Sequence, residues 1–524
     1  MFRHITDPYS NAFFYQPFTN DFPRADIHEM LSPDLLHQVI KGTFKDHLVT
    51  WVEEYLVLTH GRARADEIIA DIDRRIAVVP SFAGLRRFPE GRGFKQWTGD
   101  DSKALMKVYL PAIAGHVPSD MVRAMRAFLE FCYIVRRDVV TEDDLTMLED
   151  ALRRFHQYRE IFRTSGVRPN GFGLPRQHSL VHYIMCIRLF AALNGLCSSI
   201  TESKHIKAVK EPWRRSNRYD ALGQMLLTNQ RLDKLAACRV DFKSRGMLSK
   251  PLFSDGLDDL STNDNDQGVG IDLRPAGIGN EDDGVEEGPR VLAHVDLARK
   301  YAKGYPSDLG TLAKRLNQPQ LGSMIRNFLQ DQLAGRDEPS TSTNAFSMSI
   351  QLFCEKIRVH HTATAYFYAP SDPCGVGGMR REMIRATPSW RKGHARQDCV
   401  FIETNPHLSG MRGLDVARVL RFLSFKFRGT HYPCALVRWF CRVGDAPDED
   451  TGMWIVEPGV NIDGTAEVSV IHLDCIVRAA HLEPVYGSHF VPNLLEHHHS
   501  LDVFKSFYVN KFADHHCFEI VHHD

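Results

Sequence analysis

The sequence predicts an α+β multidomain protein that is mainly helical at first and rich in β-strands at the end. Apolar residues recur at helical spacing through much of the first half, whereas β-branched and aromatic residues crowd the last third. A strongly acidic stretch that is poor in apolar residues separates these regions. We therefore expect a mainly helical region at 1–248, followed by a disordered acidic linker at 249–290. A small helical segment at 291–334, a second linker at 335–345 and a small barrel-like β-rich domain at 346–524 complete the expected order.

The composition narrows the possible classes of protein. With 64 Lys and Arg against 65 Asp and Glu, the net charge of -1 excludes a uniformly basic nucleic-acid binder, so any DNA-binding surface must be a local patch. The 11 cysteines form no CxxC pair, which favours reduced thiols over a disulfide framework. No run of 18 apolar residues occurs and the first residues lack a secretory signal, so we expect neither a membrane span nor secretion.

Helix signals mark the first region. Ser32-Pro33-Asp34 supplies a cap, a first-turn proline and an acid at the start of a long amphipathic segment that runs to about residue 60. Thr141 and Asp144 resemble a capping box ahead of a helix at 145–162. The same periodicity predicts further helices at residues 121–137, 178–193 and 221–237, with a Pro/Gly-rich connection at 76–97.

The middle of the chain changes character twice. Residues 254–288 hold eleven acidic residues against the single Arg274, so this stretch cannot bury enough apolar surface to order itself. Residues 291–333 return to helical periodicity, which Gly304-Tyr305-Pro306 interrupts, and predict a cluster of two or three short helices.

From residue 346 onward the pattern becomes strand-like. Arg428-Gly429-Thr430 predicts a tight hairpin turn, and residues 444–452 form a longer acidic loop. These features predict a small β-barrel or sandwich that ends in a helix at 501–512. The segments richest in β-branched and aromatic residues are 398–403, 417–427, 432–443, 453–456 and 467–473.

A basic strip after Glu202 is the first candidate site. The strip contains one acid, Glu211, and one aromatic residue, Trp213. Basic groups can neutralise DNA phosphates, an aromatic ring can stack on an unpaired base, and a carboxylate can hold a divalent metal ion. An ordinary solvated helix face is the competing interpretation. The basic residues are Lys204, Lys207, Lys210, Arg214, Arg215 and Arg218.

Two other pairs place polar side chains on one helix face. Asp34 and His37 are spaced i, i+3, and the simpler interpretation is a helix-start acid with a nearby histidine. His178 and His182 are spaced i, i+4, which could hold one divalent metal ion. No cysteine pair or carboxylate is spaced to complete a tetrahedral site, so a partly buried, hydrogen-bonded histidine pair is favoured here.

Two further features carry no predicted chemistry. The glycine-rich stretch at 375–378 lacks the ending of a phosphate-binding loop, so we interpret it as a flexible turn. Clusters of histidines at 497–499, 515–516 and 522–523 lack ligand spacing, so we expect surface polar residues there.

Four separate stretches occur in the same order as in the Plavaka transposases of mushroom-forming basidiomycete fungi and resemble them. These transposases are relatives of the CACTA-type DNA transposons. The resemblance covers about residues 16–248 and implies a DDE-type enzyme: an RNase H-like sheet with two Asp, a helical insertion and a late Glu, working with Mg²⁺ or Mn²⁺. The stretches begin DFPRADIHEM, FKQWTGDDSK, LPRQHSLVHY and SSITESKHIK, at residues 21–55, 94–113, 174–183 and 198–218.

The resemblance assigns roles to the residues above. Asp34 and His37 match a D-x-x-H element of the insertion, and Glu202 matches the third metal-binding acid. His178 and His182 fall on a histidine pair of the family, which is either structural or linked to a metal ion. The resemblance also implies DNA, in the form of transposon ends, as the partner, a nuclear location and a homo-oligomer.

One departure changes the functional expectation. Both catalytic Asp should precede the D-x-x-H element, yet residues 1–30 contain no βββ pattern. We therefore expect the helical part of an RNase H-like core without its first strands, truncated and inactive in strand transfer. One alternative is a non-catalytic DNA- or chromatin-binding protein that uses the strip together with Trp439 and Trp454. Another is a metal-dependent hydrolase whose metal ligands would be five converging side chains: Asp34, His37, His178, His182 and Glu202.

Overall fold

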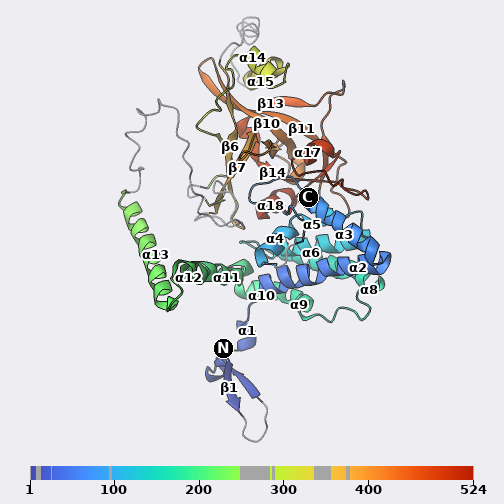
Figure 1. Ribbon diagram of the computed structural model, residues 1–524, viewed down its shortest axis with the longest axis vertical. Coiled ribbons are helices and arrows are strands. Elements are labelled where there is room, and N and C mark those ends of the chain that lie inside the picture. The colour runs from blue at the N-terminus through green and yellow to red at the C-terminus, as the bar shows by residue number, and fades with distance from the viewer. Residues whose placement is uncertain are drawn as a thin grey trace. The chain divides into compact units, whose positions relative to one another are not determined.

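The computed structural model describes residues 2–6, 13–24, 26–93, 97–247, 284–285, 290–334, 356–372 and 378–522. The chain forms two compact units: Met1–Asn194 and Gly279–Asp524 together make the first, and Gly195–Ile278 makes the second (Figure 1). The predicted linkers at 249–290 and 335–345 lie outside the described residues, except for Gly284–Val285 and Arg290.

The first unit begins with a β-hairpin that the sequence did not predict. Strands β1 (Phe2–Thr6) and β2 (Phe13–Pro17) pair antiparallel, with Phe2 opposite Pro17. A short 3₁₀ turn η1 (Phe18–Asp21) and helix α1 (Ile27–Met30) follow. This hairpin is a separate two-stranded sheet.

The helical region that follows confirms the predicted α-rich part. The expected helix to residue 60 is present as a π-helical segment η2 that continues directly into α2. The capping box of α7 is confirmed in both halves: Thr141 Oγ1 accepts from the Asp144 amide at 3.2 Å, and Asp144 Oδ2 accepts from the Thr141 amide at 2.8 Å. The elements are η2 (Leu35–Val49), α2 (Thr50–His60), α3 (Arg62–Ala77), α4 (Gly99–Met106), α5 (Tyr109–Ile113), α6 (Ser119–Ile134), α7 (Glu142–Tyr158), α8 (Glu160–Thr164), α9 (Pro175–His178), η3 (Ser179–His182) and α10 (Tyr183–Phe190).

The second unit is helical as far as it is described. Helix α13 confirms the predicted helix at 221–237 and extends it to Ser244. A turn η4 (Leu193–Leu196) leads into this unit from the first. The other elements are α11 (Ser199–His205), the π-helical η5 (Ile206–Lys210), α12 (Glu211–Arg215) and α13 (Ala221–Ser244).

The C-terminal part of the first unit is built on a nearly closed, barrel-like sheet, as predicted (Figure 1). Its strands follow the order β14-β9-β10-β11-β12-β16-β15, with β13 on β11 and β5 on β10. A smaller sheet has the order β3-β7-β6-β4, and β8 pairs with β7. The strands are β3 (Gly284–Val285), β4 (Ala293–Leu297), β5 (Arg358–His360), β6 (Thr362–Tyr368), β7 (Met379–Thr387), β8 (Arg396–Gln397), β9 (Cys399–Glu403), β10 (Leu414–Phe427), β11 (Thr430–Arg442), β12 (Ile455–Pro458), β13 (Val468–His472), β14 (Ile476–Ala480), β15 (Leu482–Pro484) and β16 (Phe507–Val509).

The β10–β11 hairpin is the centre of the larger sheet. Its register runs from Val416 opposite Phe440 to Phe427 opposite Thr430, so the tight turn predicted at 428–430 is confirmed. Arg428 and Gly429 both adopt positive φ, at 51° and 81°, which is the backbone that a two-residue hairpin turn requires. Buried side chains from both sheets, most of them aliphatic, share one hydrophobic core.

Four α-helices of the described residues accompany the sheets. Helices α14 (Leu309–Arg315) and α15 (Leu321–Ala334) pack on β10, β11 and β13, where Phe328 contacts Phe425 and Tyr432 edge-on. Helices α17 (Ser500–Val503) and α18 (His515–His522) lie near the end of the chain. Across the described ranges, no helix combines the length and the apolar character that a membrane crossing needs.

Two predicted helical stretches contain strands instead. Part of the segment predicted as helices at 291–333 is β4, in which buried Val295 pairs with Ala365 of β6. Part of the predicted helix at 501–512 is β16, which pairs with both β12 and β15. In both places pairing with strands that are distant in sequence overrides the local helical periodicity.

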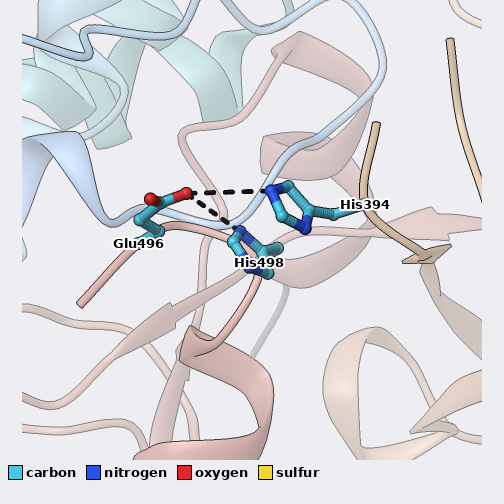
Figure 2. Close-up of side chains that lie close together, drawn as sticks. All are labelled: His394, Glu496 and His498. Carbon is cyan, nitrogen blue, oxygen red and sulfur yellow. Dashed lines mark ion pairs between the residues drawn. The ribbon is translucent and has the colours of Figure 1, made fainter. Parts of the chain in front are cut away.

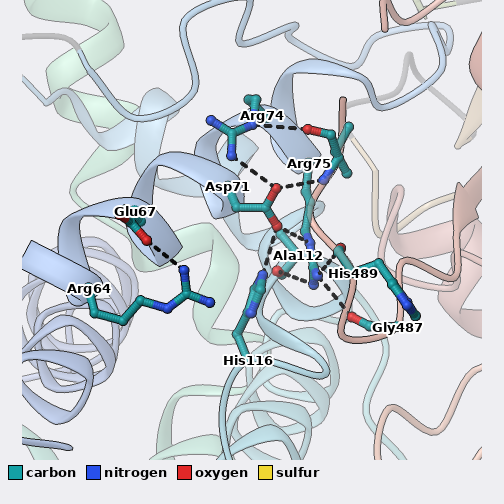
Figure 3. Close-up of polar contacts among 10 residues, drawn as sticks. Arg64, Glu67, Asp71, Arg74, Arg75, Ala112, His116, Gly487 and His489 are labelled. Carbon is teal, nitrogen blue, oxygen red and sulfur yellow. Dashed lines mark hydrogen bonds and ion pairs between the residues drawn. The ribbon is translucent and has the colours of Figure 1, made fainter. Parts of the chain in front are cut away.

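The helical region and the β-rich region are joined by a buried polar network (Figure 3). Arg75 and Asp71 of α3 are fully buried, and Arg75 Nε donates to Asp71 Oδ2 at 2.8 Å. Arg75 Nη2 also donates to the Gly487 carbonyl at 2.8 Å, while the Val491 amide donates to Asp71 Oδ1 at 2.7 Å. His116 Nε2 lies 2.7 Å from Asp71 Oδ2, and Arg74 Nη2 donates to Asp71 Oδ1 at 3.3 Å. The loop after β15 is therefore held against α3.

Apolar and charged contacts reinforce this junction. Phe82, which follows α3, belongs to the hydrophobic core of the β-rich region. Buried Lys511 donates from Nζ to Glu130 Oε1 of α6 at 2.8 Å, and His481 Nε2 lies 3.2 Å from the Pro80 carbonyl. The first unit is thus one folded body rather than two loosely connected ones.

Candidate functional site

The basic strip runs along consecutive short helical elements of the second unit, α11, η5 and α12, and its last residue, Arg218, lies in the turn after α12. All six of its basic side chains are exposed, and within the described residues none of them is ion-paired to a carboxylate. They are therefore available to bind an anionic polymer. The six residues are Lys204, Lys207, Lys210, Arg214, Arg215 and Arg218.

An aromatic side chain lies among these cations. Trp213 of α12 is 43% exposed, whereas the preceding Pro212 is buried. The turn after α12 is ordered by Asn217, whose Oδ1 accepts from the Tyr219 amide at 3.0 Å and from Gln224 Nε2 at 2.7 Å. This turn leads the chain into α13. An exposed indole beside basic groups can stack on an unpaired base while the cations contact phosphates.

Glu202 lies on α11, close in sequence to the strip. Its side chain falls outside the described residues, so its predicted role as a metal-binding acid stays a prediction. Asp34 is the N-cap of η2, and its Oδ1 accepts from the Leu36 amide at 3.1 Å. Its Oδ2 pairs with Nδ1 of His37. This geometry agrees with the simpler interpretation of a capping acid beside a histidine.

His178 and His182 end two short successive elements, α9 and η3, rather than sharing one regular helix. Their rings meet edge-on with centroids 5.1 Å apart, and both side chains are exposed, not partly buried as expected. The segment is anchored by their neighbours instead: buried Gln177 accepts from Arg159 Nη1 at 2.9 Å, and Tyr183 donates to Gln38 at 3.1 Å. Metal binding by the pair stays a prediction.

Four of the five residues proposed for a hydrolase have described side chains, and these four do not gather into one group of metal ligands. Among the described residues, one group of three potential metal ligands lies close together, and it contains none of Asp34, His37, His178 and His182. Glu202, whose side chain is not described, belongs to the second unit. The metal-dependent hydrolase therefore gains no support from the described residues.

The one close group consists of His394, Glu496 and His498 (Figure 2). His394 lies between β7 and β8, and the other two lie between β15 and α17. Their ligand atoms all lie within 4.8 Å of one another. This group could not be predicted from the sequence, because His394 is about a hundred residues away from Glu496 and no local spacing relates them.

The prediction of surface polar residues is wrong for the histidines at 515–516. Both are buried at the start of α18, with 4% and 7% exposure. The His516 ring stacks on Phe367, and its Nδ1 lies 3.2 Å from Nη1 of Arg478. Burial, reinforced by the Arg478 charge, lowers the pKa of His516 to about 3. Tertiary packing, which a run of histidines does not reveal, explains the difference.

Arg478 is the centre of a buried charge cluster beside His516. It is fully buried, and its guanidinium donates to Glu382 Oε2 at 2.5 Å and to Asp514 Oδ2 at 2.7 Å. Burial opposes ionisation of Asp514, but the charges of Arg478 and Arg380 outweigh it and hold the pKa of Asp514 well below its usual range. Because these groups pair with one another, we interpret the cluster as structural.

The two tryptophans considered for ligand binding pack inside the β-rich region. Trp454 is 4% exposed, and half-buried Trp439 packs against the same core while its indole donates to Ser469 Oγ at 2.8 Å. Trp454 therefore presents no open indole face. The glycine-rich stretch at 375–378 lies outside the described residues except for Gly378, whose φ is 74°.

Comparison with known proteins places one part of the chain. A family model described as Plavaka transposase matches residues 4–52. The match supports a Plavaka-type transposase. The matched segment begins within β1 and covers β2, α1 and all of η2, and it includes Asp34 and His37. No curated protein and no solved structure matches the chain.

Proposed function

We propose that the chain is a transposase-derived protein that grips DNA through the basic strip at 204–218. The observation that supports it most is the exposure of all six basic side chains along three short helical elements and the turn that follows them, with no described carboxylate paired to them. The Plavaka match supplies the transposase origin, for which DNA is the natural partner. A nuclear location follows from this proposal, because chromosomal DNA is there.

The physical basis of binding is the release of counterions from the DNA backbone. Each phosphate that a Lys or Arg neutralises steepens the dependence of log affinity on log salt by about 0.9. Six contacts would give a slope of about -5, with stacking by Trp213 adding affinity for unpaired bases. Because the whole chain carries a net charge of -1, such a slope would have to come from a local patch.

We further propose that this chain binds DNA without cleaving it. A two-metal mechanism needs several carboxylates that share two hard cations, and Glu202 alone offers one. No described group of three ligands includes a residue of the second unit. We therefore assign the chain no cleavage step and no Mg²⁺ or Mn²⁺ pair of the kind that an intact DDE enzyme would use.

Gel-shift titrations over a range of salt concentrations would test DNA binding. The triple variant Lys207→Ala/Arg214→Ala/Arg215→Ala should lose affinity by at least about tenfold, and its salt slope should become shallower by about 1 for each lost contact. Glu202→Ala should bind as the wild type does, since an acid does not neutralise phosphates.

A matched control removes three positive charges elsewhere. Arg62, Arg64 and Arg163 are exposed basic residues on α3 and α8 of the first unit. Replacing all three with Ala should leave the affinity for DNA within about twofold of the wild type. Equal losses in both triple variants, or no loss in the strip variant, would contradict the proposal.

A further inference from the structure

Three side chains from two distant segments meet at the edge of the β-rich region (Figure 2). The Nε2 atom of His394 lies 4.0 Å from Oε2 of Glu496, and Nδ1 of His498 lies 3.4 Å from the same oxygen. The two imidazole rings stack with nearly parallel planes and centroids 3.6 Å apart. Each ring turns a nitrogen toward the Glu496 carboxylate.

We propose that His394, Glu496 and His498 form a binding site for one divalent transition-metal ion of the zinc class. Two imidazoles and a carboxylate are a donor set of zinc sites that keep one coordination position open. With zinc–ligand bonds of about 2.0–2.1 Å, neighbouring ligand atoms of a tetrahedron lie about 3.3 Å apart. The His498–Glu496 separation of 3.4 Å already fits this spacing.

The remaining separation can close without moving the fold. The side chains of His394 and Glu496 are 63% and 62% exposed, so rotation about their side-chain bonds can shorten the 4.0 Å between their ligand atoms. His498 is the fixed member, with its side chain only 15% exposed. Its Nδ1 is shielded from solvent and makes no hydrogen bond to a described residue. A ring nitrogen in that position has a lone pair available for a metal ion.

A cavity gives an ion access to the site. Its volume is about 220 Å³, and its lining includes both histidines, Trp390 and Arg391. An ion held by the three ligands would lie at the cavity wall, where water or an anionic ligand could take the fourth position. The ion would join the segment between β7 and β8 to the segment before α17.

The neighbouring histidines provide a competing explanation. His497 and His499 flank His498, with ring centroids at 5.4 and 3.9 Å from it. A run of histidines can bind metal ions by itself, without His394 and without a defined fold. The two explanations differ because His394 lies about a hundred residues away and contributes only in the folded protein.

The test is zinc titration of the full chain, purified without a histidine tag and freed of metal, by isothermal calorimetry. We expect one equivalent of Zn²⁺ to bind. His394→Ala and His498→Ala should each weaken binding by at least about 100-fold, because removing a ligand costs more than removing one of its supporting hydrogen bonds. Glu496→Gln, which keeps the side chain's shape, should weaken binding by at least about tenfold. Cobalt(II) in the same site should give the intense visible absorption of tetrahedral coordination.

Two matched controls complete the experiment. His497→Ala/His499→Ala removes the flanking histidines, and His178→Ala/His182→Ala removes the exposed pair of the helical region; both should bind Zn²⁺ within about threefold of the wild type. Wild-type affinity in His394→Ala would overturn the site, as would no stoichiometric Zn²⁺ binding by the wild type. Loss of binding confined to His497→Ala/His499→Ala would overturn it too. Circular dichroism checks that each variant is folded. If an alanine variant does not fold, the near-isosteric Glu496→Gln still tests the site.

Discussion

At the scale of single residues, His156 of α7 shows how packing decides a protonation state. Its Nε2 atom is buried and has no hydrogen-bond partner among the described residues. Burial, together with the nearby Arg159 charge, lowers the pKa of His156 to about 4. The folded protein therefore holds this imidazole neutral, whereas the unfolded chain takes up a proton near its ordinary pKa of about 6.5.

This shift predicts a dependence of stability on pH. Because the pKa of His156 is lower in the folded state, its contribution is fully present above about pH 6.5 and is lost as the pH falls toward 4. We expect the free energy of unfolding of the wild type, relative to His156→Gln, to fall by about 2 kcal/mol across this window, allowing for partial exposure of the ring.

Urea unfolding at several pH values would measure the difference. The control is His60→Gln, which changes an exposed histidine of α2. This variant should keep the wild-type pH profile because the His60 side chain is exposed to solvent in the folded protein. Identical pH profiles for the wild type and His156→Gln would show that the imidazole is not buried in neutral form.

At the scale of elements, the Asp71–Arg75 pair holds α3 against the loop after β15. Arg75→Met should lower the free energy of unfolding by about 3–5 kcal/mol, because it removes the fully buried cation that pairs with Asp71 and leaves that buried carboxylate only Arg74 and His116. Adding Asp71→Asn to that variant should recover part of the loss. Chemical denaturation would measure both changes.

A control for this prediction lies on the same helix. Arg64 pairs with Glu67 at 2.5 Å, and both side chains are more than half exposed (Figure 3). Arg64→Met should cost no more than about 1 kcal/mol, as is usual for an exposed ion pair. Similar losses for Arg64→Met and Arg75→Met would mean that burial of the Asp71–Arg75 pair contributes nothing.

The elements also show what could be predicted from the sequence. The capping box at Thr141 and the turn at 428–429 are set by adjacent residues, so the helix and the hairpin were predictable. Strands β4 and β16 were not, since partners far along the chain stabilise them. The basic strip is likewise a local pattern, whereas the group of His394, Glu496 and His498 exists only after folding.

At the scale of the whole molecule, the first unit should unfold in a single transition. Phe82, in the connection after α3, packs in the core of the sheets, and Tyr133 of α6 donates to the carbonyl of Phe512. Far-ultraviolet circular dichroism, which follows the helices, and fluorescence of Trp454 in a variant without other tryptophans, which follows the sheet core, should give the same urea midpoint. Two separated midpoints would show that the helical and β-rich regions are independent domains.

The hydrogen bond from Arg75 to the Gly487 carbonyl also affects how the chain folds during its synthesis on the ribosome. The two residues are 412 positions apart, and a ribosome that adds about 5–20 residues per second needs about 20–80 s to pass from one to the other. During that time, the surface of α3 that later contacts residues 487–491 is exposed to solvent without its partner. We therefore expect nascent chains to depend on chaperones until the last strands emerge.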